Sequence, residues 1–237
     1  MNRQTLINYS YYCSGDYFKM IRAINEGIKV PSVSFQNCIT IFDDIYPKEF
    51  LNLRHPPLVL YYEGDLSLLK ERKIGVVGSR KACEYAIEAT KRLVLNNPDK
   101  VIVSGLAKGI DAVSHEYAMK TIGILGSGID YYYPRENMEL IKRIKKEGLV
   151  LSEYPRLTRP LAYHFPFRNR LIAALSDTLY VMQSTCNSGT MTSINEALEL
   201  GKNVKVLPYD IFNEYGENNN HLIKEGADII EREEIAF

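Results

Sequence analysis

The sequence predicts a doubly wound α/β fold built on a mostly parallel sheet. From residue 73 onward, short apolar runs rich in Val, Ile and Leu alternate with amphipathic stretches. The runs are apolar at successive positions, which indicates strands buried on both faces, as in a parallel sheet. Alternation of strands and helices is typical of a doubly wound domain with right-handed crossovers. The expected strands are 73–78, 101–105, 121–126, 149–152, 178–183 and 203–207.

The stretches between these strands have the periodicity of amphipathic helices. They predict helices near 84–96, 109–119, 137–147, 168–175 and 190–200. Each helix would return the chain to the start of the next parallel strand and cover one face of the sheet.

The first part of the chain differs from this pattern. Residues 1–55 predict a small helical N-terminal appendage, with helical patterns near 14–26 and 35–41. Residues 56–237 predict the α/β domain itself, which begins with an additional strand at 58–62. The appendage contains no recognisable chemistry.

The charge balance excludes some classes of protein. The 237 residues contain 29 Lys and Arg and 29 Asp and Glu, so the formal net charge is zero. This total argues against a protein that is basic over its whole surface or polybasic at a membrane. Residues 210–237, however, hold eight acidic and two basic side chains, so residues 1–209 carry a net charge of +6. The neutral total therefore leaves room for a local anion-binding surface.

Cysteine usage and hydropathy predict a cytoplasmic protein that uses no metal and no cofactor. Cys13, Cys38, Cys83 and Cys186 are widely separated, with no Cys-x-x-Cys pair and no histidine pair at metal-ligand spacing. We expect small buried thiols in a reducing compartment rather than a zinc site or disulfides. The N-terminus lacks the apolar segment of a secretory signal, and no apolar run approaches the ~20 residues that span a bilayer. We therefore expect no membrane association.

The residues that follow each predicted strand are the candidates for a site, because ligands of an open parallel sheet bind beyond the carboxyl ends of its strands. Gly and Ser at these positions let the backbone approach a ligand, and free N–H groups at helix N-termini favour an anion. Arg80 adds a guanidinium that can clamp a phosphate. Each loop alone is better explained by a tight turn, but the set of loops on one sheet edge favours a phosphate site. Its candidate residues are Gly78, Ser79, Arg80, Ser104, Gly105, Lys108, Ser188 and Gly189.

The segment 154–176 combines arginines with aromatic rings and contains no acidic residue. Arginines contact phosphates, and exposed rings stack on unpaired bases. The alternative is a loop with core aromatics and salt-bridged arginines, and Phe165 fits a core position equally well. Four arginines without a nearby acid favour nucleic-acid binding. The side chains concerned are Arg156, Arg159, Arg168 and Arg170 with Tyr163, His164, Phe165 and Phe167.

No catalytic constellation stands out. Asp111 and His115 lie four residues apart on a predicted helix, but Asp111 more simply supports the start of that helix. Asp130 and Glu153 follow strands without an evident partner. The Gly-x-Gly after the third expected strand is followed by Tyr131, where a dinucleotide fingerprint has its third glycine, and no Walker A pattern occurs. We therefore expect a binding protein and not an enzyme.

A set of motifs runs along residues 46–230. In chain order they are YPKEFLNLRHPPLVLYYEGD (46–65), VVGSR (76–80), SGLAKGIDAVSHEYAM (104–119), GILGSGIDYYYPREN (123–137), LSEYP (151–155), FPFRNRLIAALS (165–176), SGTMTSINEALELGKNV (188–204) and NHLIKEGA (220–227). This set resembles the motifs of the DprA/Smf DNA-processing family. The combination of FPFRNR with SGLAKGID is highly specific to that family.

The resemblance implies an extended Rossmann-like domain that binds single-stranded DNA and forms a homodimer. It also implies a recombination mediator that protects incoming strands and helps to load the RecA recombinase during natural transformation. In the family, DNA phosphates lie in a basic pocket built from the arginine of the GSR motif and the segment around the RNR motif. By motif position, the implied contacts are Gly78, Ser79, Arg80, Phe167, Arg168, Asn169 and Arg170, with Ser188 and Gly189 as further candidates.

The sequence departs from the family pattern at Ala174, Gln183 and Tyr209, none of which is an implied DNA contact. The appendage is shorter than the N-terminal domain usual in the family. No segment resembles the family's C-terminal winged helix, so the duplex-binding role of such a domain is not carried over.

Two alternative functions stay open. A nucleoside-monophosphate phosphoribohydrolase of the lysine decarboxylase-like type would share the fold, but such enzymes carry Gly-Gly-x-Gly-Thr-x-x-Glu with the glutamate near the reacting sugar. Here Ser193 occupies the position of that glutamate, and Glu196 lies a further turn along. A sensor that binds one nucleotide without catalysis is the second alternative.

Overall fold

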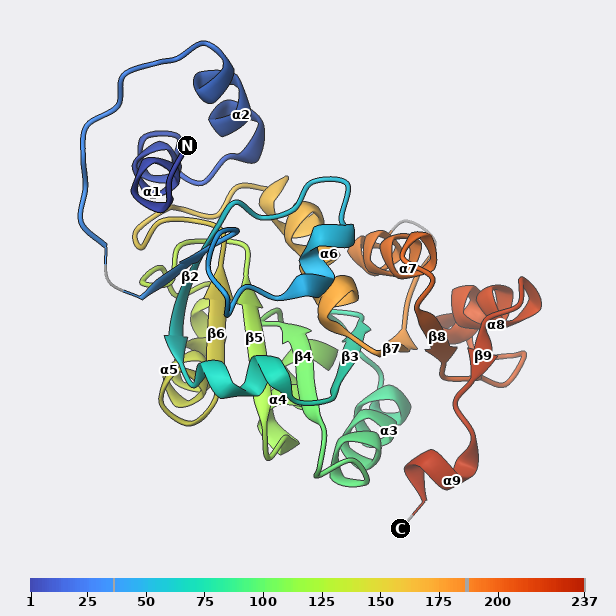
Figure 1. Cartoon of the computed structure of the whole chain (residues 1–237). Helices are drawn as coiled ribbons and strands as arrows, with labels where there is room; N and C mark the ends of the chain where they lie inside the picture. The colour runs from blue at the N-terminus through green and yellow to red at the C-terminus, as the bar shows by residue number, and fades with distance from the viewer. Residues whose placement is uncertain (36, 186–187, 237) are drawn as a thin grey trace.

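A computed structural model describes residues 1–35, 37–185 and 188–236 of the chain. Within these residues, nine strands form one sheet in the order β1-β2-β6-β5-β4-β3-β7-β8-β9 (Figure 1). Strand β2 pairs antiparallel with β1 and with β6, and the other neighbouring strands pair parallel. The strands are β1 (Cys38–Thr40), β2 (Val59–Gly64), β3 (Lys73–Gly78), β4 (Val101–Gly105), β5 (Thr121–Leu125), β6 (Leu149–Ser152), β7 (Thr178–Gln183), β8 (Asn203–Val206) and β9 (Asp228–Ile229).

The mostly parallel sheet confirms the predicted doubly wound α/β class. The six strands expected after residue 72 are present within one residue of their predicted bounds. Their continuous apolar runs are explained by burial on both sides. Val76 and Ile102 belong to one hydrophobic cluster, while the adjacent Val77 and Val103 belong to another on the opposite face.

Helices cover both faces of the sheet (Figure 1). The cluster that contains Val77 also contains side chains of α6, α7 and the 3₁₀ helix η1, whereas the cluster of Val76 contains side chains of α3 and α4. Helices α1 and α5 share a third cluster with β2 and β6. The α-helices are α1 (Arg3–Tyr12), α2 (Tyr17–Asn25), α3 (Glu84–Leu95), α4 (Ile110–Tyr117), α5 (Met138–Glu147), α6 (His164–Leu175), α7 (Gly189–Glu199), α8 (Glu217–Lys224) and α9 (Arg232–Ile235). The 3₁₀ helices are η1 (Lys48–Asn52), η2 (Leu66–Lys70), η3 (Arg135–Asn137) and η4 (Glu214–Gly216).

The direction of winding reverses between β3 and β7. From β3 the chain proceeds outward through β4 and β5 to β6, and it then returns to place β7 on the other side of β3. The helices that follow β3 and β7 pack on opposite faces of the sheet, because α3 and α7 belong to different hydrophobic clusters. Loops that leave a sheet in opposite directions open a crevice between them, which is the usual ligand position in this fold.

The appendage differs in part from its prediction. Helix α2 lies within the expected 14–26, but α1 was not expected, and the prediction of a helix near 35–41 is wrong. Residues 38–40 form β1, which adds a strand to the sheet through pairing with β2. Ile39, Thr40 and Ile41 are β-branched and suit a strand once a neighbouring strand is available.

Helix α1 packs on the sheet as part of its core. Leu6 and Ile7 are buried in the same cluster as Tyr61 of β2, and the Tyr61 hydroxyl hydrogen-bonds the Ser10 hydroxyl at 3.0 Å. The apolar positions of α1 are interspersed with Tyr and Ser, so its sequence shows little helical amphipathicity. Its place therefore depends on contacts with residues some 50 positions later in the chain.

The cysteines fit the expectation of small buried groups where the structure describes them. Cys13 and Cys38 are buried, Cys83 is partly buried, and all three are free thiols. Burial raises the pKa of the Cys13 and Cys38 thiols. Cys186 lies outside the described residues.

No helix in the described part of the chain has the length and apolar character that a bilayer crossing requires.

Buried His115 predicts that acid destabilises the protein. Its Nδ1 lies 2.6 Å from the Thr121 hydroxyl, and burial lowers the pKa of the ring to about 3. Below about pH 6.5 the unfolded chain binds a proton at this position that the folded chain does not bind. The free energy of unfolding should therefore fall by about 1 kcal/mol per pH unit as the pH drops below 6, on account of this residue alone.

Thermal unfolding between pH 7.5 and pH 4.5 checks this prediction. We expect His115→Gln to show a flatter dependence of the melting temperature on pH than the wild type. The exposed His221, whose side chain is 57% accessible, supplies the control variant His221→Gln, which should follow the wild type. Equal slopes for all three proteins would contradict the prediction.

Candidate functional site

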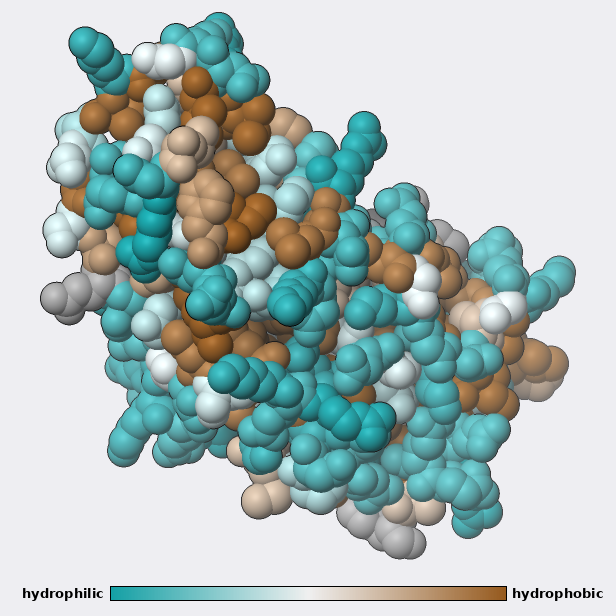
Figure 2. Space-filling model, in the orientation of Figure 1, coloured by the Kyte–Doolittle hydropathy of each residue, from teal (hydrophilic) through white to brown (hydrophobic). Residues whose placement is uncertain are grey.

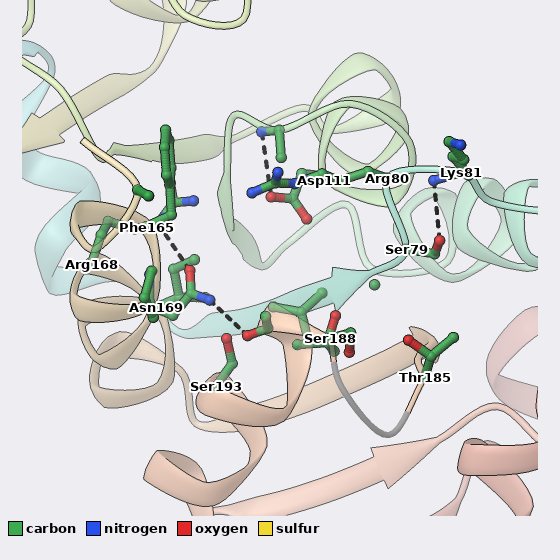
Figure 3. Close-up of a pocket in the computed structure, with 18 of the residues that line it drawn as sticks. Ser79, Arg80, Lys81, Asp111, Phe165, Arg168, Asn169, Thr185, Ser188 and Ser193 are labelled. Atoms are coloured by element: carbon green, nitrogen blue, oxygen red, sulfur yellow. Dashed lines mark hydrogen bonds between the residues drawn. The ribbon is translucent and has the colours of Figure 1, made fainter. Parts of the chain in front are cut away.

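A cavity of about 760 Å³ opens where the winding reverses (Figure 3). The loop after β3, the first turns of α6 and the start of α7 surround it, and α4 contributes one side chain. We call this space the switch-point cavity. Its polar and aromatic lining includes Ser79, Arg80, Lys81, Asp111, Tyr133, Phe165, Arg168, Asn169, Thr185, Ser188, Thr190 and Ser193.

The loop after β3 is held by the start of α4. The backbone N–H of Ile110 donates to the Ser79 carbonyl at 3.2 Å, and the Lys81 N–H donates to Ser79 Oγ at 3.0 Å. Gly109 has φ +74°, and a Cβ there would lie 2.2 Å from the Ser79 carbonyl oxygen. Only glycine permits this close approach in this conformation. The SGLAKGID motif thus positions the loop that carries Arg80.

Arg80 is exposed at the mouth of the switch-point cavity. Its guanidinium carbon lies 5.6 Å from the centre of the Phe165 ring. No carboxylate among the described residues lies within salt-bridge distance of it. The hydrogen-bonding capacity of this guanidinium is therefore free for a ligand.

Arg168 provides a second cation deep in the cavity. Its side chain is buried, and its guanidinium donates to the Ile124 carbonyl and, through Nε, to Asn169 Oδ1 at 3.0 Å. Burial lowers the pKa of Arg168 to about 10, an effect partly offset by the nearby Asp111 carboxylate. The group still carries its charge at neutral pH.

Asp111 lies in the first turn of α4 and is buried close to Arg168. Burial raises the pKa of its carboxyl, while the positive charge of Arg168 acts against that rise. A Cβ at Gly105 would lie 2.5 Å from Asp111 Oδ2 and 2.6 Å from Arg168 Nη2. Gly105 therefore provides space for these two side chains. Asp111 is the one carboxylate among the described residues that line the cavity, and it is balanced by Arg168. The further charges of Arg80 and Lys81 therefore give the cavity a net positive charge.

The N-terminus of α7 forms the wall opposite Arg80 (Figure 3). Asn169 Nδ2 donates to the Gly189 carbonyl at 2.9 Å, which ties α6 to the start of α7. The hydroxyl of Ser188, the N-cap residue, is buried and has no hydrogen-bond partner among the described residues. The free N–H groups and the dipole of a helix N-terminus favour a negatively charged ligand.

The side chains of the FPFRNR motif, which lies in α6, line two different cavities. Phe165 and Arg168 lie three residues apart, on the face that lines the switch-point cavity. Phe167 and Arg170, also three apart, lie on another face and line a second cavity. This division follows from the helix, because positions two apart are separated by about 200° around its axis.

Arg170 is engaged inside the protein. Its Nη1 and Nη2 atoms each lie 2.6 Å from one oxygen of the buried Glu153 carboxylate. It also donates to the backbone carbonyls of His55 at 3.1 Å and Phe167 at 2.7 Å. These bonds hold the linker before β2 against α6, and they leave little of the guanidinium for a ligand.

The structure brings part of the predicted site together at the switch-point cavity. The remaining predicted residues do not line this cavity. Ser104 is buried, and its hydroxyl donates to the Val76 carbonyl at 2.6 Å. Lys108 lies in a small adjoining cavity and pairs with Glu136 at 2.5 Å. The predicted residues that line the switch-point cavity are Gly78, Ser79, Arg80, Arg168, Asn169, Ser188 and Gly189.

The structure adds Lys81 to the predicted lining residues, and it decides the positions of Phe165 and Arg156. Lys81 could have been found, because it follows Arg80 in the same loop. Phe165 is only partly buried and lines the cavity, which decides between its core and exposed interpretations. Arg156 pairs with Asp130 through an Nη2–Oδ1 contact of 2.9 Å, as the salt-bridged alternative for this segment expects.

The glutamate of the phosphoribohydrolase pattern has no counterpart at the switch-point cavity. Ser193 lines the cavity at the corresponding position, and Glu196 lines the second cavity instead. No group of three or more His, Cys, Asp or Glu side chains in the described ranges is arranged to hold a metal ion.

The fold and the cavity together define a Rossmann-like α/β protein with a cationic site at the point where its sheet reverses direction. A family model described as DNA recombination-mediator protein A matches residues 37–236. The chain belongs to this family, known as DprA or Smf, which confirms the resemblance seen in the motifs.

Known relatives agree with this assignment. The chain is 39% identical over 208 residues to DNA processing protein DprA of Streptococcus pneumoniae, covering 85% of this chain and 71% of the relative. It is 40% identical over 201 residues to the Bacillus subtilis protein of the same name, covering 82% and 68%. Both relatives are named for DNA processing.

Solved structures show the same fold. The crystal structure of DprA from Streptococcus pneumoniae matches with a TM-score of 0.79 at 32% identity, over 97% of this chain and 90% of that chain. DNA processing protein A from Helicobacter pylori matches with a TM-score of 0.75 at 36% identity, over 81% and 90%. The latter structure is described in terms of a single-stranded DNA binding mode.

Proposed function

We propose that the protein binds single-stranded DNA in the switch-point cavity and acts as a recombination mediator. The observation that carries this proposal is the convergence of three cations, Arg80, Lys81 and Arg168, and a helix N-terminus on one cavity. Exposed Arg80 has no ion-pair partner in the described chain, and buried Arg168 lies behind it. The Helicobacter pylori relative, which is described as binding single-stranded DNA, supports the choice of ligand.

The geometry favours a single strand over a duplex. Phosphates would contact Arg80 and Lys81 at the mouth and the N–H groups at the start of α7. The Phe165 ring lies beside Arg80, where it can stack on an unpaired base. A paired base offers no free face for such stacking, so a duplex would use only the phosphate contacts.

A salt titration tests this function. We expect a single-stranded oligonucleotide to bind more tightly than its duplex at equal salt. With about three neutralised phosphates, the logarithm of the association constant should fall with the logarithm of salt concentration with a slope of about −2. Fluorescence anisotropy between 50 and 300 mM salt measures both quantities. Equal affinity for the two forms, or tighter binding of one mononucleotide than of the oligomer, would contradict the proposal and favour a nucleotide sensor.

The finer roles implied by the family resemblance complete the proposal. We infer that the protein forms a homodimer, works in the cytoplasm, protects incoming strands and helps to load RecA during natural transformation. Sedimentation of the full chain measures the oligomeric state. Assembly of RecA on single-stranded DNA, with and without the protein, measures the loading step.

A further inference from the structure

A second cavity of about 470 Å³ lies on the other side of the first turn of α6. Helix α2 of the appendage, the linker before β2, α6 and α7 all contribute to it, so we call it the appendage cleft. Pro166 lines both the appendage cleft and the switch-point cavity, which makes the two spaces neighbours. The residues of the cleft used below are Phe18, Arg54, His55, Tyr163, Phe167, Glu196 and Glu199.

Aromatic rings form one side of the appendage cleft. The Phe18 ring lies 5.0 Å from the His55 ring and 5.9 Å from the Phe167 ring, measured between ring centres. Rings that only attach α2 to the domain would be buried between the two. Phe18 is instead 58% exposed and Tyr163 is 53% exposed. Hydrophobic side chains are visible on the surface of the appendage at the upper left of Figure 2.

Carboxylates of α7 form another side of the cleft. Glu196 and Glu199 have no hydrogen-bond or ion-pair partner among the described residues. Arg170 also lines the cleft, but its guanidinium is engaged by Glu153. Two unpaired carboxylates repel a phosphate group, and they accept hydrogen bonds from N–H donors. This side of the cleft is thus unsuited to the DNA backbone and suited to a neutral ring with amino groups.

Arg54, in the linker before β2, adds a cation to the lining of the cleft. It is exposed and lines the cleft, and no ion-pair partner for it lies among the described residues. An exposed arginine, aromatic rings and unpaired carboxylates in one cleft would suit a nucleotide whose phosphate contacts the arginine and whose base contacts the rings and carboxylates.

We propose that the appendage cleft is a nucleobase subsite. It takes an unpaired base that carries an exocyclic amino group, from the same strand whose phosphates occupy the switch-point cavity. The base stacks on Phe18 and donates its amino hydrogens to Glu196 or Glu199. This inference rests on the proposed binding of single-stranded DNA, and it gives the N-terminal appendage a direct part in that binding.

Substitution of Phe18 tests the stacking. The full chain is titrated by anisotropy with oligonucleotides of about 12 residues, in wild-type, Phe18→Ala and Tyr12→Ala form. Tyr12 is the matched control, because it is an aromatic residue of the appendage, 53% exposed, that lines neither cavity. We expect Phe18→Ala to weaken binding by about tenfold and Tyr12→Ala to leave it unchanged.

A scan with abasic sites separates stacking from a change in fold. One abasic residue at the position that occupies the cleft should weaken binding to the wild type and have no effect on Phe18→Ala. The same abasic oligonucleotide should bind wild type and Phe18→Ala equally.

The carboxylates predict a base preference. Cytosine offers an amino donor, whereas the N3–H donor of thymine lies between two carbonyl oxygens that repel a carboxylate. We expect the wild type to prefer oligo-dC over oligo-dT, and the variant Glu196→Gln/Glu199→Gln to lose that preference.

The outcomes distinguish this inference from the function on which it rests. If the wild type binds single strands and Phe18→Ala binds them as tightly as Tyr12→Ala, the subsite is wrong and the proposed function stands. A loss of RecA loading in Phe18→Ala without any loss of DNA affinity would likewise overturn the subsite, in favour of a protein partner. Absence of single-strand binding by the wild type would overturn the proposed function itself.

Discussion

Replacement of Arg80 by alanine is expected to weaken single-stranded DNA binding by about 10- to 100-fold, since a hydrogen-bonded charged contact contributes about 1.5–3 kcal/mol. The side chain is exposed at the mouth of the switch-point cavity. Among the described residues, it contacts the ring of Phe165. Its removal should therefore abolish a phosphate interaction without disturbing the fold. The slope of the salt dependence should become shallower by about 0.7 for each phosphate that the variant no longer neutralises.

Two further variants define what Arg80 contributes. Arg80→Lys keeps the charge and loses the planar fork that contacts two phosphate oxygens, so we expect an intermediate affinity. Arg92→Ala is the control, because Arg92 lies on α3 in an exposed pair with Glu88 and does not line the cavity. Anisotropy titrations at two salt concentrations compare the four proteins. Equal binding by Arg80→Ala and Arg92→Ala would refute the assignment of this arginine to the DNA site.

Replacement of Arg170 by methionine is expected to lower stability rather than affinity. The substitution leaves the Glu153 carboxylate buried without its partner, and removal of one member of a buried pair costs about 3–5 kcal/mol. For a chain of this length, that destabilisation corresponds to a fall in melting temperature of about 6–20 °C. The double variant Arg170→Met/Glu153→Leu should recover part of the stability, because no buried charge is left unpaired.

An exposed ion pair in the same segment supplies the comparison. Arg156→Met breaks the pair with Asp130, whose side chains are 45% and 29% accessible, and should cost less than about 1 kcal/mol. Differential scanning calorimetry measures the melting temperatures. DNA affinity is then measured at a temperature where Arg170→Met is folded, and we expect a change of less than about threefold, much smaller than that of Arg80→Ala. Normal stability with a reduced affinity would instead make Arg170 a DNA contact.

The different positions of Arg168 and Arg170 could not be predicted from the sequence. The RNR motif presents two arginines in one short segment without acids, and both were equally good candidates for phosphate contacts. The motif itself does not show that one guanidinium faces the switch-point cavity and the other meets Glu153. Glu153 stands 17 residues before Arg170 in the chain, so the buried pair appears only once β6 and α6 pack together.

The start of α6 could not be predicted for a related reason. Two prolines and three aromatic residues in 160–167 favour a loop, and the helix was expected only from residue 168. The structure begins α6 at His164, with Pro166 in the first turn, where its missing N–H is not required. This extra turn directs Phe165 and Phe167 into different cavities.

The sheet, and the edge of it on which a ligand would bind, could be predicted from the sequence. Apolar runs buried on both sides mark parallel strands, and small residues after them mark the loops at their carboxyl ends, because both signals are local. Arg80 could be singled out in the same way, since its place at the cavity depends only on its position after β3. The partners of buried charges, the pairing of β1 and the aromatic appendage cleft emerge only when the chain packs. Each of these depends on contacts between residues far apart in the chain, and a pattern confined to neighbouring positions carries no information about such contacts.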